Sequence, residues 1–175
     1  ELDITDSEAV EAFVEFNAID CIVNCAAYTA VDKAEENEEL CDLLNNVAPG
    51  YLAKAVGKRG GCMVQVSTDY VFDGQGEEPW RPDDKNYSPL NVYGKTKLEG
   101  ELAVSSVLEK YFIVRIAWVF GKNGKNFVKT MLGLGDKYEE LRVVCDQIGT
   151  PTYTYDLARL LVDMAESDKY GYYHA

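Results

Sequence analysis

Short apolar runs and longer amphipathic stretches alternate along the chain. The apolar runs are typical of buried strands and occupy residues 21–25, 62–67, 112–117, 141–145 and 170–174. The amphipathic stretches predict helices over residues 7–17, 31–59, 90–109, 126–134 and 155–166. Strands that alternate with helices are typical of a parallel sheet covered by helices, with right-handed crossovers between the strands. The pattern therefore predicts a fold of the α/β class.

Local signals refine three of these segments. Asp6 and Ser7 are natural N-cap residues and place the start of the first helix. Pro49 predicts a break or a fresh first turn inside residues 31–59, because proline has no N–H to donate. Residues 73–89 hold glycines, prolines and charges and predict a long loop. A loop of that length in a compact domain usually has a function.

Composition and charge narrow the class of partner. The 175 residues, 47% of them hydrophobic, suffice for one domain with a substantial core. A net charge of -13 without a clustered basic face argues against nucleic acid, although helix N-termini can still hold a small anion. Because no apolar run approaches the roughly 18 residues of a membrane span and no leader opens the chain, we expect no membrane partner.

The cysteines indicate the compartment. The chain has five, Cys21, Cys25, Cys41, Cys62 and Cys145, which is an odd number without a Cys-x-x-Cys pair. Four of the five lie in apolar contexts. This favours reduced, buried thiols in a cytoplasmic protein over a disulfide framework. His174 is the only histidine, so no structural metal site is expected.

Tyr93 and Lys97 form the first candidate pair for chemistry. They are four residues apart and share one face of a helix if that helix has begun by Tyr93, so both can address one ligand. A free tyrosine has a pKa of about 10, and a nearby cation such as Lys97 would lower it by favouring phenolate. An exposed helix pair is the alternative, since the chain holds 12 tyrosines.

Thr68 lies at the end of a predicted strand, where open α/β sheets place their ligands. Its hydroxyl could hydrogen-bond a substrate carbonyl while negative charge develops on the oxygen. A Ser-Thr-Asp run is equally typical of simple turn capping. These residues alone leave both interpretations open.

Taken together, the strand-end threonine and the Tyr-x-x-x-Lys segment about 25 residues later resemble the active site of the extended short-chain dehydrogenase/reductase superfamily. Within it, the chain is most similar to the family of dTDP-4-dehydrorhamnose reductases. The similarity is found in residues 24–35, 67–74, 91–101, 117–121, 126–127 and 146–152. It implies a doubly wound parallel sheet of the Rossmann-like kind.

The resemblance also implies an activity and its residues. Members of the family reduce the C4 keto group of dTDP-4-dehydro-6-deoxy-L-mannose to dTDP-L-rhamnose with NADPH or NADH. The catalytic residues carried over are Thr68, Tyr93 and Lys97. The cofactor would lie against Asp3, Ile4, Ala26, Ala27, Tyr93 and Lys97. The dTDP-sugar would contact Val31, Thr68, Tyr70 and Trp118.

Ordinary packing is the alternative for several of these residues. The two alanines suit close helix–strand packing, and an aromatic residue at a strand end is often part of the core or its rim. Asn45 matches the asparagine of the superfamily's central helix, where it would shape the site or simply pack. Some family members hold Mg²⁺ at a dimer interface, so the resemblance extends to a homodimer with such a site.

One family feature is absent from the chain, the glycine-rich turn that follows the first strand and approaches the cofactor pyrophosphate. We therefore expect roughly the first forty residues of the family pattern, two βα units, to be missing, and the end of the substrate domain as well. Residues 1–175 would then form a partial dinucleotide-binding domain, incomplete at the N-terminus, with the start of a substrate-binding part around residues 124–155. Alone, such a chain should bind cofactor poorly and be marginally stable.

Two rival functions share part of the pattern. A sugar-nucleotide epimerase or dehydratase would keep the tyrosine and lysine with different sugar-contact motifs. A non-catalytic regulatory subunit of the kind that accompanies methionine adenosyltransferase would keep the Tyr-x-x-x-Lys segment as well. Trp118 and residues 147–152 favour the reductase over both.

Overall fold

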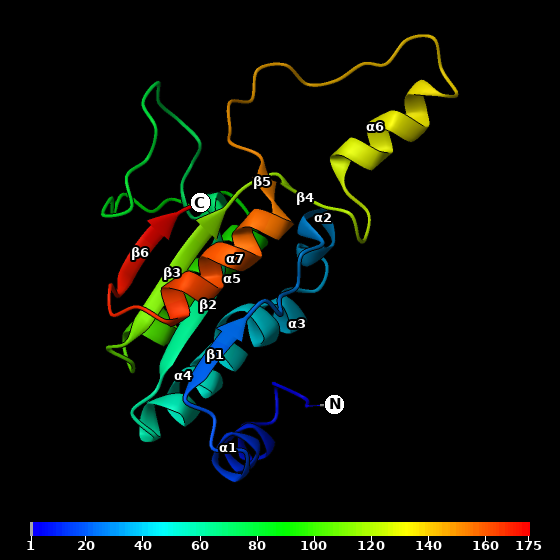
Figure 1. The fold of residues 1–175 in the computed structure, drawn as a ribbon. Helices are drawn as coiled ribbons and strands as arrows, with labels where there is room; N and C mark the ends of the chain where they lie inside the picture. Colours follow the sequence, from blue (N-terminus) through cyan, green and yellow to red (C-terminus); the bar gives the residue numbers. More distant parts are fainter. Residues whose placement is uncertain (1) are drawn as a thin grey trace.

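Four parallel strands form the sheet at the centre of the computed structural model, which describes residues 2–175 (Figure 1). Their order is β1-β2-β3-β6, and all three neighbouring pairs are parallel. The strands are β1 (Cys21–Asn24), β2 (Cys62–Thr68), β3 (Tyr111–Ile116) and β6 (Gly171–His174). The α/β class with a parallel sheet is confirmed, as are four of the five predicted strands.

Helices cover both faces of the sheet, which makes the fold doubly wound (Figure 1). The helices α1 (Ser7–Phe16), α4 (Ala48–Lys58) and α5 (Val92–Ser105) lie on one side, and α7 (Thr154–Ala165) lies on the other. Neighbouring residues of β2 point to opposite faces: Met63 joins the core under α4, and Val64 joins the core under α7. Burial on both faces explains why consecutive residues at the start of this strand, Cys62, Met63 and Val64, are all apolar.

The start of α1 is where the sequence places it. The Asp6 carboxylate accepts hydrogen bonds from the backbone N–H groups of Glu8 and Ala9, both at 3.0 Å. Asp6 is therefore the N-cap, and it satisfies two donors that the first helical turn leaves free.

The helix predicted over residues 31–59 is only partly right. It divides into a short α2 (Val31–Ala34) and a second helix that begins with α3 (Glu38–Asp42), passes through the π-helical turn η1 (Leu43–Val47) and continues as α4. The break at residues 35–37 was not predicted, whereas Pro49 lies in the first turn of α4, as predicted. The π turn shifts the hydrogen-bond register just before Pro49, which has no N–H to place in either register.

Helix α5 crosses the π turn so closely that a side chain at Gly100 has no room. A Cβ atom there would lie 2.0 Å from the backbone oxygen of Asn45. We expect Gly100→Ala to lower the free energy of unfolding, measured with urea, by about 1–3 kcal/mol through overpacking. Gly50→Ala is the matched control, because its Cβ would meet Ala103 at an ordinary 3.5 Å. Equal stability of the two variants would contradict this reading of the helix crossing.

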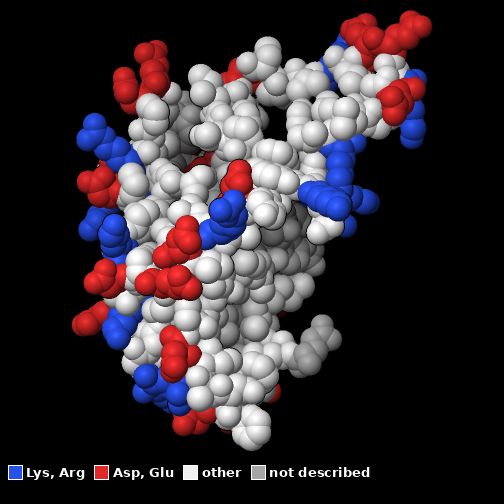
Figure 2. Space-filling view, in the orientation of Figure 1, with Lys and Arg blue, Asp and Glu red and all other residues white. Residues whose placement is uncertain are grey.

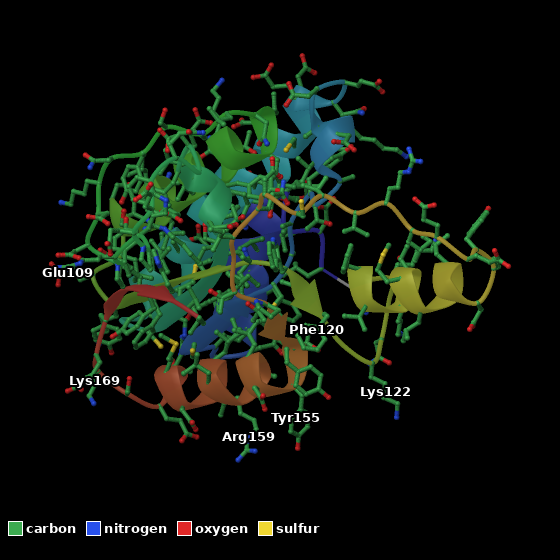
Figure 3. All side chains as sticks on the ribbon, turned by 90° about the horizontal axis from the view of Figure 1, so that it is seen from above. Glu109, Phe120, Lys122, Tyr155, Arg159 and Lys169 are labelled. Atoms are coloured by element: carbon green, nitrogen blue, oxygen red, sulfur yellow. The ribbon has the colours of Figure 1, made fainter. Side chains whose placement is uncertain are left out.

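The strand predicted over residues 141–145 is also wrong, because residues 137–151 form no helix or strand. The helix expected just before it is present as α6 (Phe127–Gly135), with none of its residues buried. Seen from above, α6 stands apart from the sheet, while Phe120 and Tyr155 lie near the start of α7 (Figure 3). An apolar run needs a neighbouring strand to complete its hydrogen-bond ladder, and residues 141–145 have none. A two-stranded parallel sheet of β4 (Val119–Phe120) and β5 (Thr152–Tyr153) flanks this excursion.

The thiols are less buried than their apolar contexts predict. All five cysteines are free, but only Cys41 and Cys62 are buried, while Cys25 and Cys145 are exposed. Cys25 follows an edge strand, and Cys145 lies in the unpaired excursion, so neither is covered by a helix. Acidic and basic side chains are interspersed over the face that Figure 2 shows. Within residues 2–175, no helix has both the length and the apolar character of a membrane span.

Candidate active site

The predicted catalytic helix begins early enough to place Tyr93 and Lys97 on one face. Asn91 is the N-cap, and its side-chain oxygen accepts a hydrogen bond from the backbone N–H of Gly94 at 2.7 Å. Helix α5 then runs from Val92, so Tyr93 lies in its first turn. The helix has therefore begun by Tyr93, as the prediction for Tyr93 and Lys97 required, and the two side chains share one face.

Tyr93 meets the end of β2. Burial raises the pKa of its phenol, while the neighbouring Thr68 side chain opposes that rise. The ring of Tyr70 lies edge-on to Tyr93, with centroids 5.7 Å apart and an interplanar angle of 80°. Thr68, Tyr70 and Tyr93, predicted from separate segments, thus share one site at the carboxyl end of a parallel strand.

The amine of Lys97 is buried one helical turn further on. The residue is 4% exposed, and its Nζ donates a hydrogen bond to the backbone oxygen of Val66 at 2.6 Å. Burial lowers the pKa of Lys97 to about 8, against the opposing effect of Glu101. The lysine is therefore mostly protonated at neutral pH and has two N–H donors left for a ligand.

The expectation that Lys97 lowers the pKa of Tyr93 is wrong for this structure. The pKa of the phenol is raised because burial disfavours phenolate, and Lys97 is not among the groups that shift it. The Lys97 ammonium is held by the Val66 carbonyl. A phenol with a raised pKa stays protonated at neutral pH, which suits a proton donor.

Thr68 caps the turn that follows β2. Its Oγ1 accepts from the backbone N–H of Tyr70 at 3.2 Å and donates to the Asp69 carboxylate at 3.1 Å. The 3-10 turn η2 (Asp69–Val71) starts from this cap. The capping interpretation is thus confirmed, and a role toward substrate stays a prediction that capping does not oppose, since a hydroxyl can turn its hydrogen.

The loop after β1 is fixed beside this site by two asparagines. Asn24 donates to the side chain of Gln65 at 2.8 Å and accepts from the backbone N–H of Ala26 at 3.1 Å. The Asn45 side chain accepts a hydrogen bond from the backbone N–H of Tyr28 at 2.8 Å and donates one to the backbone oxygen of Tyr28 at 3.2 Å. Ala26 is exposed and its neighbour Ala27 half-buried, so two small residues lie at the carboxyl end of β1.

Asp3 and Ile4 lie before α1, and their contacts are local ones away from Tyr93. Asp3 accepts from the backbone N–H and the hydroxyl of Thr5, at 2.9 and 2.7 Å. Ile4 packs half-buried against the core beneath α4. Within residues 2–175, no hydrogen bond joins either of them to the Tyr93 group, so the structure does not bring these two candidates into it.

Trp118 is half exposed between β3 and β4 and has a φ of +47°, in the left-handed region that bulky residues rarely adopt. Gly149 lies directly against its indole, since a Cβ there would be 3.0 Å from two ring atoms. Val31, the other candidate sugar contact, is half-buried at the start of α2. The strained backbone at Trp118 is a feature that the sequence did not predict.

A buried ion pair beside the site also went unpredicted. Arg115 on β3 and Glu101 on α5 are joined at 2.7 Å, and each side chain is 1% exposed. The signal in the sequence is a lone arginine inside the apolar run of β3, because a buried charge requires a partner. Among residues 2–175, no cluster of three or more histidine, cysteine or acidic side chains is arranged to hold a metal ion.

Comparison with known proteins agrees with this geometry. The family model described as RmlD substrate binding domain matches residues 1–175. The dTDP-4-dehydrorhamnose reductase of Escherichia coli (strain K12) is 43% identical over an alignment 177 positions long, which covers 98% of this chain and 59% of that protein.

Two solved structures of the same description are similar throughout the chain. A dTDP-4-dehydrorhamnose reductase from Clostridium acetobutylicum has a TM-score of 0.95 at 48% identity, over 99% of this chain and 61% of its own. One from Bacillus anthracis, in complex with NADP, has a TM-score of 0.91 at 42% identity, over 99% and 62%. The chain thus spans about three fifths of the length of the relatives that it matches.

Proposed function

The chain belongs to the family of the RmlD substrate binding domain, which matches all its residues, and on this premise we propose that the intact protein reduces a 4-keto sugar nucleotide. The proposed substrate is dTDP-4-dehydro-6-deoxy-L-mannose and the product dTDP-L-rhamnose. One observation carries the proposal: the Thr68 hydroxyl, the Tyr93 phenol and the Lys97 ammonium gather at the carboxyl end of β2.

Each of the three residues has a chemical task that its surroundings support. Tyr93 donates its phenolic proton to the C4 oxygen, and burial keeps that proton in place until substrate accepts it. Thr68 turns its hydroxyl from Asp69 toward the same oxygen. The Lys97 ammonium, held by the Val66 carbonyl, orients the bound cofactor and substrate through its two remaining N–H donors.

A reduced nicotinamide, when bound, supplies the hydride that C4 requires. We propose NADPH, because the solved relative from Bacillus anthracis is a complex with NADP. The residues present fit such a group: Lys97 has donors free for ribose hydroxyls, and Ala26 and Ala27 leave space after β1. Asp3 and Ile4 would lie on the adenine side. The free thiols support a reducing compartment, the cytoplasm.

The sugar is proposed to rest between Val31, Tyr70 and Trp118, with residues 124–155 as the start of the substrate-binding part. The exposed half of the Trp118 indole offers a flat apolar surface for a deoxysugar ring. We expect Trp118→Ala to raise KM for the sugar nucleotide roughly 2–10-fold, the value of one aromatic contact. Trp118→Phe keeps an aromatic ring, so its KM should lie between that of the unsubstituted protein and that of the alanine variant. An unchanged KM in the alanine variant would remove Trp118 from the sugar site.

The test is an assay of NADPH absorbance with dTDP-4-dehydro-6-deoxy-L-mannose and the intact protein. Stoichiometric oxidation of NADPH with formation of dTDP-L-rhamnose supports the proposal. Interconversion of sugar nucleotides without net oxidation would identify an epimerase instead. No turnover would favour a regulatory protein of reductase-like fold.

A further inference from the structure

Helix α5 is docked on β2 by three side chains spaced one turn apart. Tyr93 meets Thr68, Lys97 bonds to the backbone of Val66, and Glu101 bonds to Ser67. The first two contacts belong to the proposed chemistry. The third, at Glu101, has no task in it and is the most deeply buried, at 1% exposure.

Glu101 makes full use of its carboxylate. Oε1 accepts from the Ser67 hydroxyl at 2.6 Å and from Arg115 Nε at 2.9 Å, while Oε2 accepts from Arg115 Nη2 at 2.7 Å. The pairing with arginine is bidentate, the geometry that fixes both direction and distance. Ser67 directly precedes Thr68, so the Glu101 carboxylate fixes the position of α5 along its axis relative to the end of β2.

Arg115 extends the same contact across the sheet. Ser67, Arg115 and His174 are register partners on β2, β3 and β6. The guanidinium lies 5.0–5.2 Å from three aromatic ring centroids and donates to the Tyr87 hydroxyl at 3.1 Å. The ion pair therefore ties the catalytic helix to three strands and to the loop of residues 73–89.

Glu101 also faces Lys97 from one turn along the same helix. The other titratable groups that act on Lys97 are the thiols of Cys25, after β1, and Cys41, on α3. Of the three, Glu101 alone is a carboxylate, and it has the largest effect opposing burial at Lys97. Arg115 is not among the groups that shift the pKa of Lys97.

We propose that Glu101 is a positioning residue: its carboxylate holds helix α5 in register with the end of β2 and places a negative charge one helical turn from the buried Lys97 ammonium. A role of Glu101 in catalysis rests on the proposed function. The contacts of Glu101 are independent of that function, so the inference can be tested without measuring turnover.

The test is the titration of Lys97 itself, followed by NMR of lysine labelled with ¹³C at Cε, in the intact protein. The main variant is Glu101→Gln combined with Arg115→Met, which removes both members of the pair and leaves neither charge buried alone. We expect its Lys97 midpoint to fall by about one pH unit, a tenfold loss of the protonated fraction at alkaline pH. Any alkaline limb of kcat that follows Lys97 should move to lower pH with it.

Two controls separate charge from packing. Ser67→Ala removes one hydrogen bond and keeps both charges, and Glu101→Asp keeps the carboxylate on a shorter side chain. Both should leave the Lys97 midpoint near its native value. A native or higher midpoint in the folded double variant would overturn the inference. A fall of the midpoint in a protein that never oxidises NADPH would sustain the inference and defeat the proposed function, so the two failures are distinguishable.

Discussion

Replacing Tyr93 with phenylalanine is expected to lower kcat for NADPH oxidation by about 10²–10⁴-fold, the range of a lost general acid. The change removes one oxygen and keeps the ring that packs edge-on against Tyr70. The fold and the affinity for cofactor should therefore remain, and steady-state kinetics beside a binding measurement will separate the two effects. Tyr51→Phe is the matched control, because Tyr51 packs half-buried against the core under α4, away from the proposed chemistry.

The pH dependence of the proposed activity in the unsubstituted protein sharpens this prediction. Burial raises the pKa of Tyr93, so the phenol stays a competent donor through neutral and mildly alkaline pH. Lys97, with a pKa lowered to about 8, loses its proton first. Activity should then decline as pH rises through about 8, before the phenol ionises. Turnover that survives Tyr93→Phe, with an unchanged decline near pH 8, would assign proton donation to another group.

The local parts of the site could be predicted because local rules decide them. Helical periodicity places Tyr93 and Lys97 on one face once Asn91 caps the helix, and a strand end places Thr68 at the ligand edge. The direction of the pKa shift at Tyr93 could not be predicted the same way. Spacing reveals a nearby cation, but not how deeply the phenol is buried or that the Val66 carbonyl holds the cation.

The elements that were mispredicted depend on partners distant in the sequence. Residues 141–145 look like a strand, but a strand forms only where another supplies its hydrogen bonds. The π turn before Pro49 forms where α5 presses Gly100 against Asn45, a contact between separate helices. The ion pair of Glu101 and Arg115 likewise exists only when helix and sheet are packed together.

Arg115→Met is expected to have the largest effect on stability of any single change to an ion pair in the described chain, about 3–5 kcal/mol in the free energy of unfolding. The substitution strands the Glu101 carboxylate at 1% exposure with one hydrogen bond, from Ser67. A buried charge without its counter-charge is destabilising, because neither water nor an ion pair compensates its desolvation. Urea unfolding followed by circular dichroism will measure the loss.

Two comparisons decide whether charge is the cause. Lys58→Met breaks an ion pair with Glu11 whose side chains are 60% and 55% exposed, so it should cost about 0–1 kcal/mol. Adding Glu101→Gln to Arg115→Met removes the stranded charge but not the lost stacking of the guanidinium on Phe72, and should recover much of the stability. An equal loss in the single and double variants would mean that Arg115 stabilises the sheet edge through its aromatic packing, and that the ion pair adds specificity of register without net stability.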